Sequence, residues 1–220
     1  MKLTLVLLIS VLTGFAATDT EKRVQAAATV LQEIMETSDR SIPQDLLNKA
    51  ECAVVVPGMK QGAFIVGAKF GRGFVSCRTG NAGWSAPAAI RIEGGSVGFQ
   101  IGGTETDIIM LVLNRSGAEK LMSSKFTVGA DATVAAGPVG RTTGAETDAY
   151  LRAEILSWSR SRGAFAGIAL KGSTLRPDEK SNQELYGKEL TTRAVVMDGT
   201  PVNEAGQPLV SALTKYSARK

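Results

Sequence analysis

The sequence predicts an α+β domain in which an antiparallel, partly barrel-like β-sheet is joined by N-terminal helices and short flanking helices. Three observations lead to this prediction. The chain begins with helical periodicity, its middle consists of short β-branched or aromatic runs broken by Gly, Pro and Asn, and its tail is polar with short helix signals. Helices and strands therefore occupy separate stretches, which is typical of α+β domains and not of alternating βα units.

Length and composition fit one globular domain. The chain has 220 residues, of which 44% are hydrophobic and 21% charged, so it is long enough to bury one sizeable core. Its 24 glycines indicate tight turns and strands that pack close to other backbone. The net charge of +4 suits anionic surfaces but is too small to predict nucleic-acid binding.

The first 16 residues have the pattern of a secretory signal peptide. Lys2 precedes a short apolar run over residues 3–15, and Gly14 and Ala16 place small residues before a cleavage site that follows Ala16. The run is shorter than the ~20 apolar residues that a membrane-spanning helix needs. We therefore expect an exported protein, periplasmic or secreted, that is peripheral to the membrane.

Residues 17–40 are predicted to hold an N-terminal amphipathic helix, because apolar residues from Val24 to Met35 recur at helical spacing. Pro43 suits the first turn of a second helix over 43–50. Six strands are then predicted in the runs "CAVVVP", "GAFIVGAKF", "GFVSCR", "AAIRIEG", "SVGFQIGG" and "TDIIMLVLN". Ser116 is expected to cap a brief helix over about 117–123.

The remaining elements are shorter. Further strands are predicted in "DATVAAG", "EILSWSRS" and "AFAGIALKG", and short helices after Asp178 and Pro208. We therefore divide the chain into a signal peptide (1–16), an N-terminal helix (17–40), a main domain (41–195) and a C-terminal tail (196–220).

Cys52 and Cys77 are the two cysteines of the chain, near the start of one predicted strand and the end of another. An oxidising compartment outside the cytoplasm favours a disulfide between them. Two buried free thiols are the alternative, since cysteine is often buried without a bond.

A Gly-x-Ser-x-Gly motif at Gly94–Gly98 raises the question of a catalytic Ser96. The chain contains no histidine, so it cannot by itself supply the base of a Ser-His-Asp triad. No helix pattern follows Ser96, although a Ser-Lys dyad stays formally open. Two cysteines without histidine also disfavour zinc and copper sites. We therefore predict a non-catalytic protein without a cofactor or metal.

A Gly-x-Glu-Thr-Asp pattern occurs twice, at Gly103–Asp107 and Gly144–Asp148. Alternation along a strand would place Glu105 and Asp107 on one face, and likewise Glu146 and Asp148. Such pairs are suited to a hard cation, but no full calcium-loop spacing is present, which favours solvated acids.

Two further stretches suit anionic ligands. "AAGPVGR" places glycine-flanked backbone N–H groups beside Arg141. "SWSRSRGAFAG" places Trp158, Arg160 and Arg162 on one strand face, and guanidinium groups match phosphate oxygens. The alternative for this second stretch is a solvated basic edge strand.

Several motifs in order resemble the SYLF domain. They are "WSAPAAIRIEGGSVGFQIGGTETDIIMLVLN", "GADATVAAGPVGR", "SWSRSRGAFAGIALKGSTL" and "ELYG", and the resemblance covers roughly residues 40–190. It implies a lipid-binding domain that prefers anionic headgroups and has no established catalytic residues. The positions of Cys52 and Cys77 resemble those of exported bacterial members.

The resemblance singles out Arg141, Arg160 and Arg162 within the matching motifs, and we expect them, with Trp158, at the lipid headgroup. Eukaryotic members of this family bind phosphoinositides and actin beside an SH3 or zinc-finger companion, which this sequence does not show. Export would remove those cytosolic partners. We therefore expect an anionic lipid or membrane surface as the partner, or, as the alternative, a structural or protein-interaction role in the cell envelope.

Overall fold

The structure is a computed structural model that describes residues 16–37, 41–64, 66–80, 83–97, 102–139, 152–161, 164–168 and 170–217. The helical elements are α1 (Asp19–Glu36), α2 (Gln44–Lys49), α3 (Arg115–Leu121), α5 (Glu179–Tyr186), α6 (Thr192–Val196), η1 (Glu204–Gly206) and α7 (Gln207–Tyr216). The strands are β1 (Cys52–Phe64), β2 (Val66–Thr79), β3 (Gly83–Trp84), β4 (Ala88–Val97), β5 (Gly102–Val112), β6 (Phe126–Thr127), β7 (Val134–Ala136), β8 (Ile155–Ser161), β9 (Ala164–Gly167) and β10 (Thr174–Pro177).

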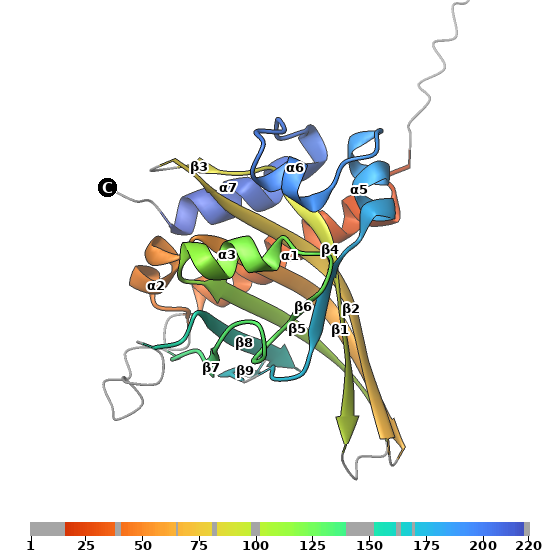
Figure 1. The fold of residues 1–220 in the computed structure, drawn as a ribbon, viewed down its shortest axis with the longest axis vertical. Coiled ribbons are helices and arrows are strands. Elements are labelled where there is room, and N and C mark those ends of the chain that lie inside the picture. Colours follow the sequence, from red (N-terminus) through yellow and green to blue (C-terminus); the bar gives the residue numbers. More distant parts are fainter. Residues whose placement is uncertain are drawn as a thin grey trace, which may run out of the picture.

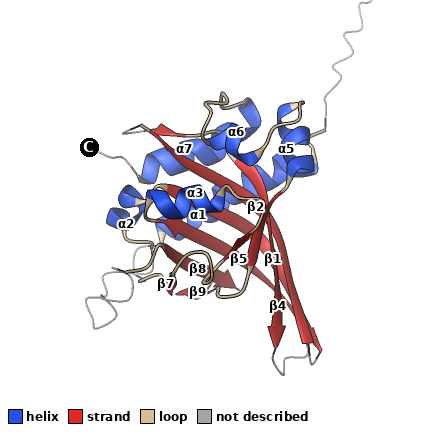
Figure 2. Cartoon of the chain, in the orientation of Figure 1, coloured by secondary structure: helices blue, strands red, loops and turns tan. Residues whose placement is uncertain are grey.

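In the described part of the chain the strands form one curled sheet in the order β6-β10-β4-β2-β1-β5-β8-β7, with β3 beside β2 and β9 beside β8. The named strands pair antiparallel except β7 and β8, which run parallel. The sheet curls into a half-barrel (Figure 1), with helices packed against it (Figure 2). The predicted α+β class and partly barrel-like antiparallel sheet are confirmed.

The two faces of the sheet enter two apolar clusters, as alternation along β1 illustrates. Ala53 and Val55 face the helices α1 and α7, whereas Val54 and Val56 face the concave interior, which α3, β6, β10 and α6 close. Side chains on both faces of β1 from Cys52 to Val56 are almost completely buried. The central strands therefore form the middle layer of the molecule.

Helix α1 begins with a capping box. The Thr18 hydroxyl accepts a hydrogen bond from Glu21 N at 3.1 Å, and the Glu21 carboxylate accepts one from Thr18 N at 2.7 Å. Helix α2 begins after Pro43, as predicted. Helix α3 is capped two residues earlier than predicted, because Asn114 Oδ1 and not Ser116 accepts from Gly117 N, at 2.7 Å.

The segment after residue 196 is part of the core. Helix α7 packs along α1 and buries Leu209 and Leu213 in the helix-side cluster. At the C-terminal end of α7, Ser217 Oγ accepts a hydrogen bond from Trp84 Nε1 at 2.8 Å, which connects the C-terminal segment to β3. The first and last helices of the described chain thus cover the sheet together (Figure 1).

Several predicted strand boundaries are wrong. "CAVVVP" and the start of "GAFIVGAKF" form one strand, β1, in which Pro57 and Gly58 make a bulge with a positive φ of 58° at Gly58. β1 ends at Phe64 and β2 begins at Val66, inside the predicted strand, and β2 joins the rest of that run to "GFVSCR". In the same way "SVGFQIGG" is divided between the end of β4 and the start of β5. A glycine-rich apolar run has no polar residue to mark a turn, so its pattern resembles one strand.

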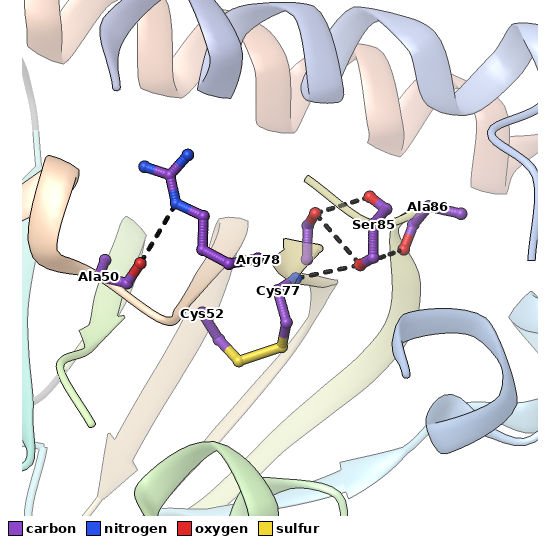
Figure 3. The surroundings of a disulfide bond; sticks show 7 residues. Ala50, Cys52, Cys77, Arg78, Ser85 and Ala86 are labelled. Atoms are coloured by element: carbon purple, nitrogen blue, oxygen red, sulfur yellow. Dashed lines mark hydrogen bonds between the residues drawn. A yellow bond between two sulfur atoms is a disulfide. The ribbon is translucent and has the colours of Figure 1, made fainter. Parts of the chain in front are cut away.

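The predicted disulfide between Cys52 and Cys77 is confirmed (Figure 3). The two residues are directly opposite each other in β1 and β2, and both side chains are buried on the concave face. Cys77 N donates to Ser85 Oγ at 3.0 Å beside the bridge.

Among the residues that the structure describes, no helix is both long and apolar enough to cross a membrane.

Candidate functional site

Trp158 lies in the core. Its side chain has no exposed surface, and its indole Nε1 donates a hydrogen bond to Pro138 O at 3.0 Å. Gly137 lies against the ring so closely that an added Cβ would be 2.0 Å from Trp158 Cε2. The glycine of the "AAGPVGR" stretch therefore makes room for the tryptophan, and the indole is not accessible to a ligand at the surface.

Arg160 lies on the same face of β8 as Trp158, as the alternation predicted, and connects the sheet to α1. Its Nη2 is 2.8 Å from Asp107 Oδ2, and its Nη1 pairs with Glu33 of α1. Burial opposes the charge of Arg160. The hydrogen bonds that its guanidinium group donates to Glu33 and Asp107 outweigh burial and raise the pKa of Arg160. With 23% of its side chain exposed and two carboxylates bound, Arg160 has a structural role here.

Asp107 has two partners and does not form a cation site. Besides Arg160, it accepts a hydrogen bond from Gly58 N at 2.9 Å, so it fixes the bulge of β1. Within the described residues no group of three or more metal-binding side chains comes together. Ser96 lies in β4 opposite Gly67 of β2, which is not the strand-turn-helix context of a nucleophile elbow.

Four of the residues that the sequence singled out lie outside the described residues. They are Arg141, Arg162, Glu146 and Asp148. Their expected roles stay predictions, and so does the role of Arg160 at a headgroup.

Three other arginines come together on the sheet, and the sequence reading missed them. Arg72 of β2, Arg91 of β4 and Arg176 of β10 are directly opposite one another in three neighbouring strands. We call them the arginine row. Their side chains are 47%, 39% and 36% exposed. Each stands alone between apolar or small neighbours in its own strand, so the group appears only once the strand register is known.

Two carboxylates accompany the arginine row. Glu93 is 2.7 Å from Arg91 Nε and 3.5 Å from Arg176 Nε, and Asp178 is 3.3 Å from Arg72 Nε. Three guanidinium groups against two carboxylates leave one positive charge in excess. The Arg91 Nε is buried and makes no aligned hydrogen bond despite its short distance to Glu93.

The surroundings of the row contain both cations and carboxylates. Burial, followed by repulsion from Arg72, lowers the pKa of Arg23 on α1, and Asp178 partly offsets this shift. Lys180 joins Arg91 and Arg176 around a shallow depression of about 310 Å³, which Asp178 and Glu179 also line. The row therefore offers forked donors in a solvent-accessible setting of mixed charge.

Beside the row, the sheet continues past its helices. β10 pairs with β4 only as far as Glu93, and β8 pairs with β5 only from Asp107 onward. Beyond these points β4, β2, β1 and β5 run on as a four-stranded extension, at the lower right of Figure 1. We call residues 60–64, 66–70, 94–97 and 102–105 the sheet tip. Phe70, at 46% exposure, is the most exposed large hydrophobic residue of the described chain.

The fold and these surfaces define a half-barrel α+β domain whose accessible features are an arginine row and an uncovered sheet end. A family model described as "Ysc84: Las17-binding protein actin regulator" matches residues 93–216, and the chain belongs to this family, which is the SYLF-domain family that the motifs indicated.

Three relatives place the chain within the family. It is 30% identical over 206 residues to human SH3 domain-containing YSC84-like protein 1, covering 90% of this chain and 60% of the relative. It is 35% identical over 170 residues to the Xenopus laevis protein of that name, covering 74% and 50%. It is 28% identical over 202 residues to protein YSC84 of Saccharomyces cerevisiae, covering 88% and 43%. The chain thus spans 60% or less of the length of these relatives.

Proposed function

We propose that this protein is an exported, non-catalytic domain that binds anionic membrane surfaces through the arginine row. The observation that carries the proposal is the alignment of Arg72, Arg91 and Arg176 across three strands with their side chains 36–47% exposed. Arginine presents five donors in a planar fork that matches phosphate oxygens, and each ion pair of the row uses Nε, so the remaining donors can bind headgroup phosphates.

Export rests on two independent observations. The first 16 residues have the composition of a signal peptide, and Cys52 and Cys77 form a disulfide of the kind that persists in oxidising compartments. Arg141 and Arg162, which match motifs of the family, remain proposed headgroup contacts. Arg160 is a weaker candidate because Asp107 and Glu33 already bind its guanidinium group.

The proposal is tested by flotation of the purified protein with vesicles of phosphatidylcholine alone and of phosphatidylcholine with phosphatidylglycerol, across a salt series. We expect binding only to the anionic vesicles and weaker binding as salt increases. The variant Arg91→Ala/Arg176→Ala, which we call the row variant, should lose about 5-fold in affinity per arginine, since each basic residue near an anionic surface contributes about 1 kcal/mol.

Two matched controls separate the row from general charge. Arg115→Ala/Arg193→Ala removes two positive charges, one from α3 and one from α6, and both residues are exposed. This variant should change the affinity less than twofold. Arg91→Lys/Arg176→Lys keeps the charge but removes the planar fork, so it should recover only part of the affinity that the row variant loses. Absence of binding to anionic vesicles at low salt would refute the proposed function, and equal losses in the row variant and the charge control would remove the row from the site.

A second candidate function is a protein-interaction role in the cell envelope. The observation that favours it is the backbone edge of the sheet tip, where residues 94–97 of β4 and 102–106 of β5 each pair with one neighbouring strand in the described structure. Such edges accept an added strand from a partner. The description of the family model, which names Las17 binding and actin regulation, points the same way for the family. Crosslinking in the envelope from position 104 would capture such a partner.

A further inference from the structure

We propose that the sheet tip inserts into the headgroup region of an anionic bilayer and so fixes the orientation of the protein on the membrane. This inference rests on the proposed function, because it assigns a second contact to the same membrane-binding event. It is carried by the exposed face of the tip, by the exposure of Phe70 and by the distribution of charge along the four strands.

One face of the tip lacks a protein layer, and the other face is partly covered. On the face that α1 covers elsewhere, Gly95, Ala68, Gly62 and Gly103 lie opposite one another in β4, β2, β1 and β5, and all four are exposed. A Cβ added to Gly62, Gly95 or Gly103 would meet no atom within 4 Å. On the opposite face Gln61 and Lys69 are partly buried, Gly67 is buried, and a Cβ added to Gly94 would lie 3.4 Å from Ser173.

The next residues toward the body of the protein carry the exposed aromatic ring. Phe70 lies opposite Lys60 of β1 and Glu93 of β4, and the Arg72 guanidinium carbon is 5.7 Å from the centre of its ring. A large apolar side chain at 46% exposure, bordered by cations, has the composition of a membrane-interface contact.

Charge stops abruptly at the border of the tip. Residues 61–68 and 94–104 contain no charged side chain, and their sequence is glycine-rich and apolar, "QGAFIVGA" and "GGSVGFQIGGT". Lys60, which lies opposite Glu105, and Lys69 mark the border. Glu93 and the arginine row follow on the side of the body, where arginines outnumber carboxylates. The sheet therefore passes from an uncharged end to a band rich in cations. An anionic membrane has the matching layers, with an apolar interior beneath anionic headgroups.

The dimensions agree with a shallow insertion. At about 3.3 Å per residue, Lys60 and Lys69 are roughly 10–13 Å from the strand ends at Phe64 and Val66. If the strand ends reach about 5–10 Å below the boundary of headgroups and acyl chains, these lysines lie at headgroup level. The backbone of Arg72, about 20 Å from the end of its strand, then lies about 10–15 Å above that boundary, so its long side chain reaches the headgroups at the deeper end of this range. Deeper insertion is excluded because the open edges of β4 and β5 need water.

A bilayer fits the tip better than a protein partner does. A protein docked on the exposed face would leave the ends of the strands in water, whereas lipid can surround the exposed face and the strand ends together. The cationic band also matches an anionic lipid surface, while a second copy of this chain would bring the same positive charges together.

The test places a tryptophan at the tip and another at a matched exposed position. Gly62→Trp reports the tip, because Gly62 is exposed, lies about 7 Å from the end of β1 and has no atom within 4 Å of an added Cβ. Met197→Trp, at an exposed methionine after α6, is the control. The native Trp84 and Trp158 are buried, so their emission serves as a constant background. Each protein is mixed with phosphatidylcholine–phosphatidylglycerol vesicles that contain lipids brominated at a shallow acyl position, and urea unfolding verifies that both variants fold.

We expect the emission of Gly62→Trp to shift to the blue and to be quenched by the brominated lipid, with no change for Met197→Trp. Phe70→Ser should lower the affinity for these vesicles about fivefold, since roughly half of one phenylalanine surface is transferred. Binding without quenching at position 62 would overturn the insertion and leave the proposed function intact. No binding at all would overturn both, and a blue shift that depends on protein concentration without lipid would assign the tip to a second copy.

Discussion

Reduction of the disulfide between Cys52 and Cys77 should destabilise this protein strongly. The bridge joins β1 to β2 across a sequence separation of 25 residues. In the chain-entropy description, closing a loop of that length removes about 3.5 kcal/mol of unfolded-state entropy at 25 °C. Stabilities of natural domains are roughly 5–15 kcal/mol, so the bridge supplies a large share of the total.

The assay compares urea unfolding of the oxidised protein with that of the same protein kept reduced. Trp84 and Trp158 are buried in different parts of the helix-side cluster, so their fluorescence reports global unfolding. With the urea dependence usual for small proteins, we expect the midpoint to fall by roughly 1–3 M. Cys52→Ala/Cys77→Ala is the matched control, because reductant should leave its midpoint unchanged.

Two results would contradict this reasoning. Two free thiols in the denatured, unreduced protein would show that no bridge forms. A bridge that forms but leaves the midpoint unchanged on reduction would show that the folded hairpin does not depend on the link. Either result would also weaken the proposal of export, since a stabilising bridge requires an oxidising compartment.

Two further predictions concern charged side chains. Arg160→Ala should lower the free energy of unfolding by about 1–3 kcal/mol, because its ion pairs are partly buried, while vesicle affinity stays within about twofold; a loss as large as that of the row variant would place Arg160 at the headgroup. The pKa of Glu154 is lowered because its carboxylate accepts a hydrogen bond from Thr133 N and pairs with Lys120. A lowered pKa stabilises the folded state above the ordinary carboxyl pKa, and this contribution is lost as the pH falls through the folded value. Glu154→Gln should therefore cost about 1 kcal/mol at pH 7 and nothing in acid, as measured by urea unfolding across pH; a difference independent of pH would contradict this.

The order of elements could be predicted from the sequence, but turns inside uniform runs could not. Helical periodicity located α1, and β-branched runs located the central strands. The turn between Phe64 and Val66 was missed because the surrounding residues are apolar or glycine on both sides. The short strand β10, from Thr174 to Pro177, was missed because four residues carry too little periodicity.

The candidate site was harder to predict, because it depends on which strands become neighbours. Alternation placed Trp158 and Arg160 correctly on one face of β8, but it did not show that Gly137 and Glu33 would enclose them. Arg91 and Arg176 are far apart in the sequence and became a group only through the pairing of β10 with β4. The disulfide could be predicted because it followed from the expected oxidising compartment and the presence of two cysteines, without knowledge of the strand register.

The different situations of Arg160 and Arg91 follow from what covers each of them. Both lie on the helix-facing side of the sheet, each in a strand among small and apolar neighbours. Above Arg160, α1 supplies Glu33, so the guanidinium group closes a contact between helix and sheet. Arg91 has only Glu93 of its own strand, and 39% of its side chain faces solvent. An arginine under α1 is held by the fold, whereas Arg91 keeps a partly exposed side chain and is one of those that we propose for an anionic partner. The strand pattern alone does not show which of the two arginines the helix covers.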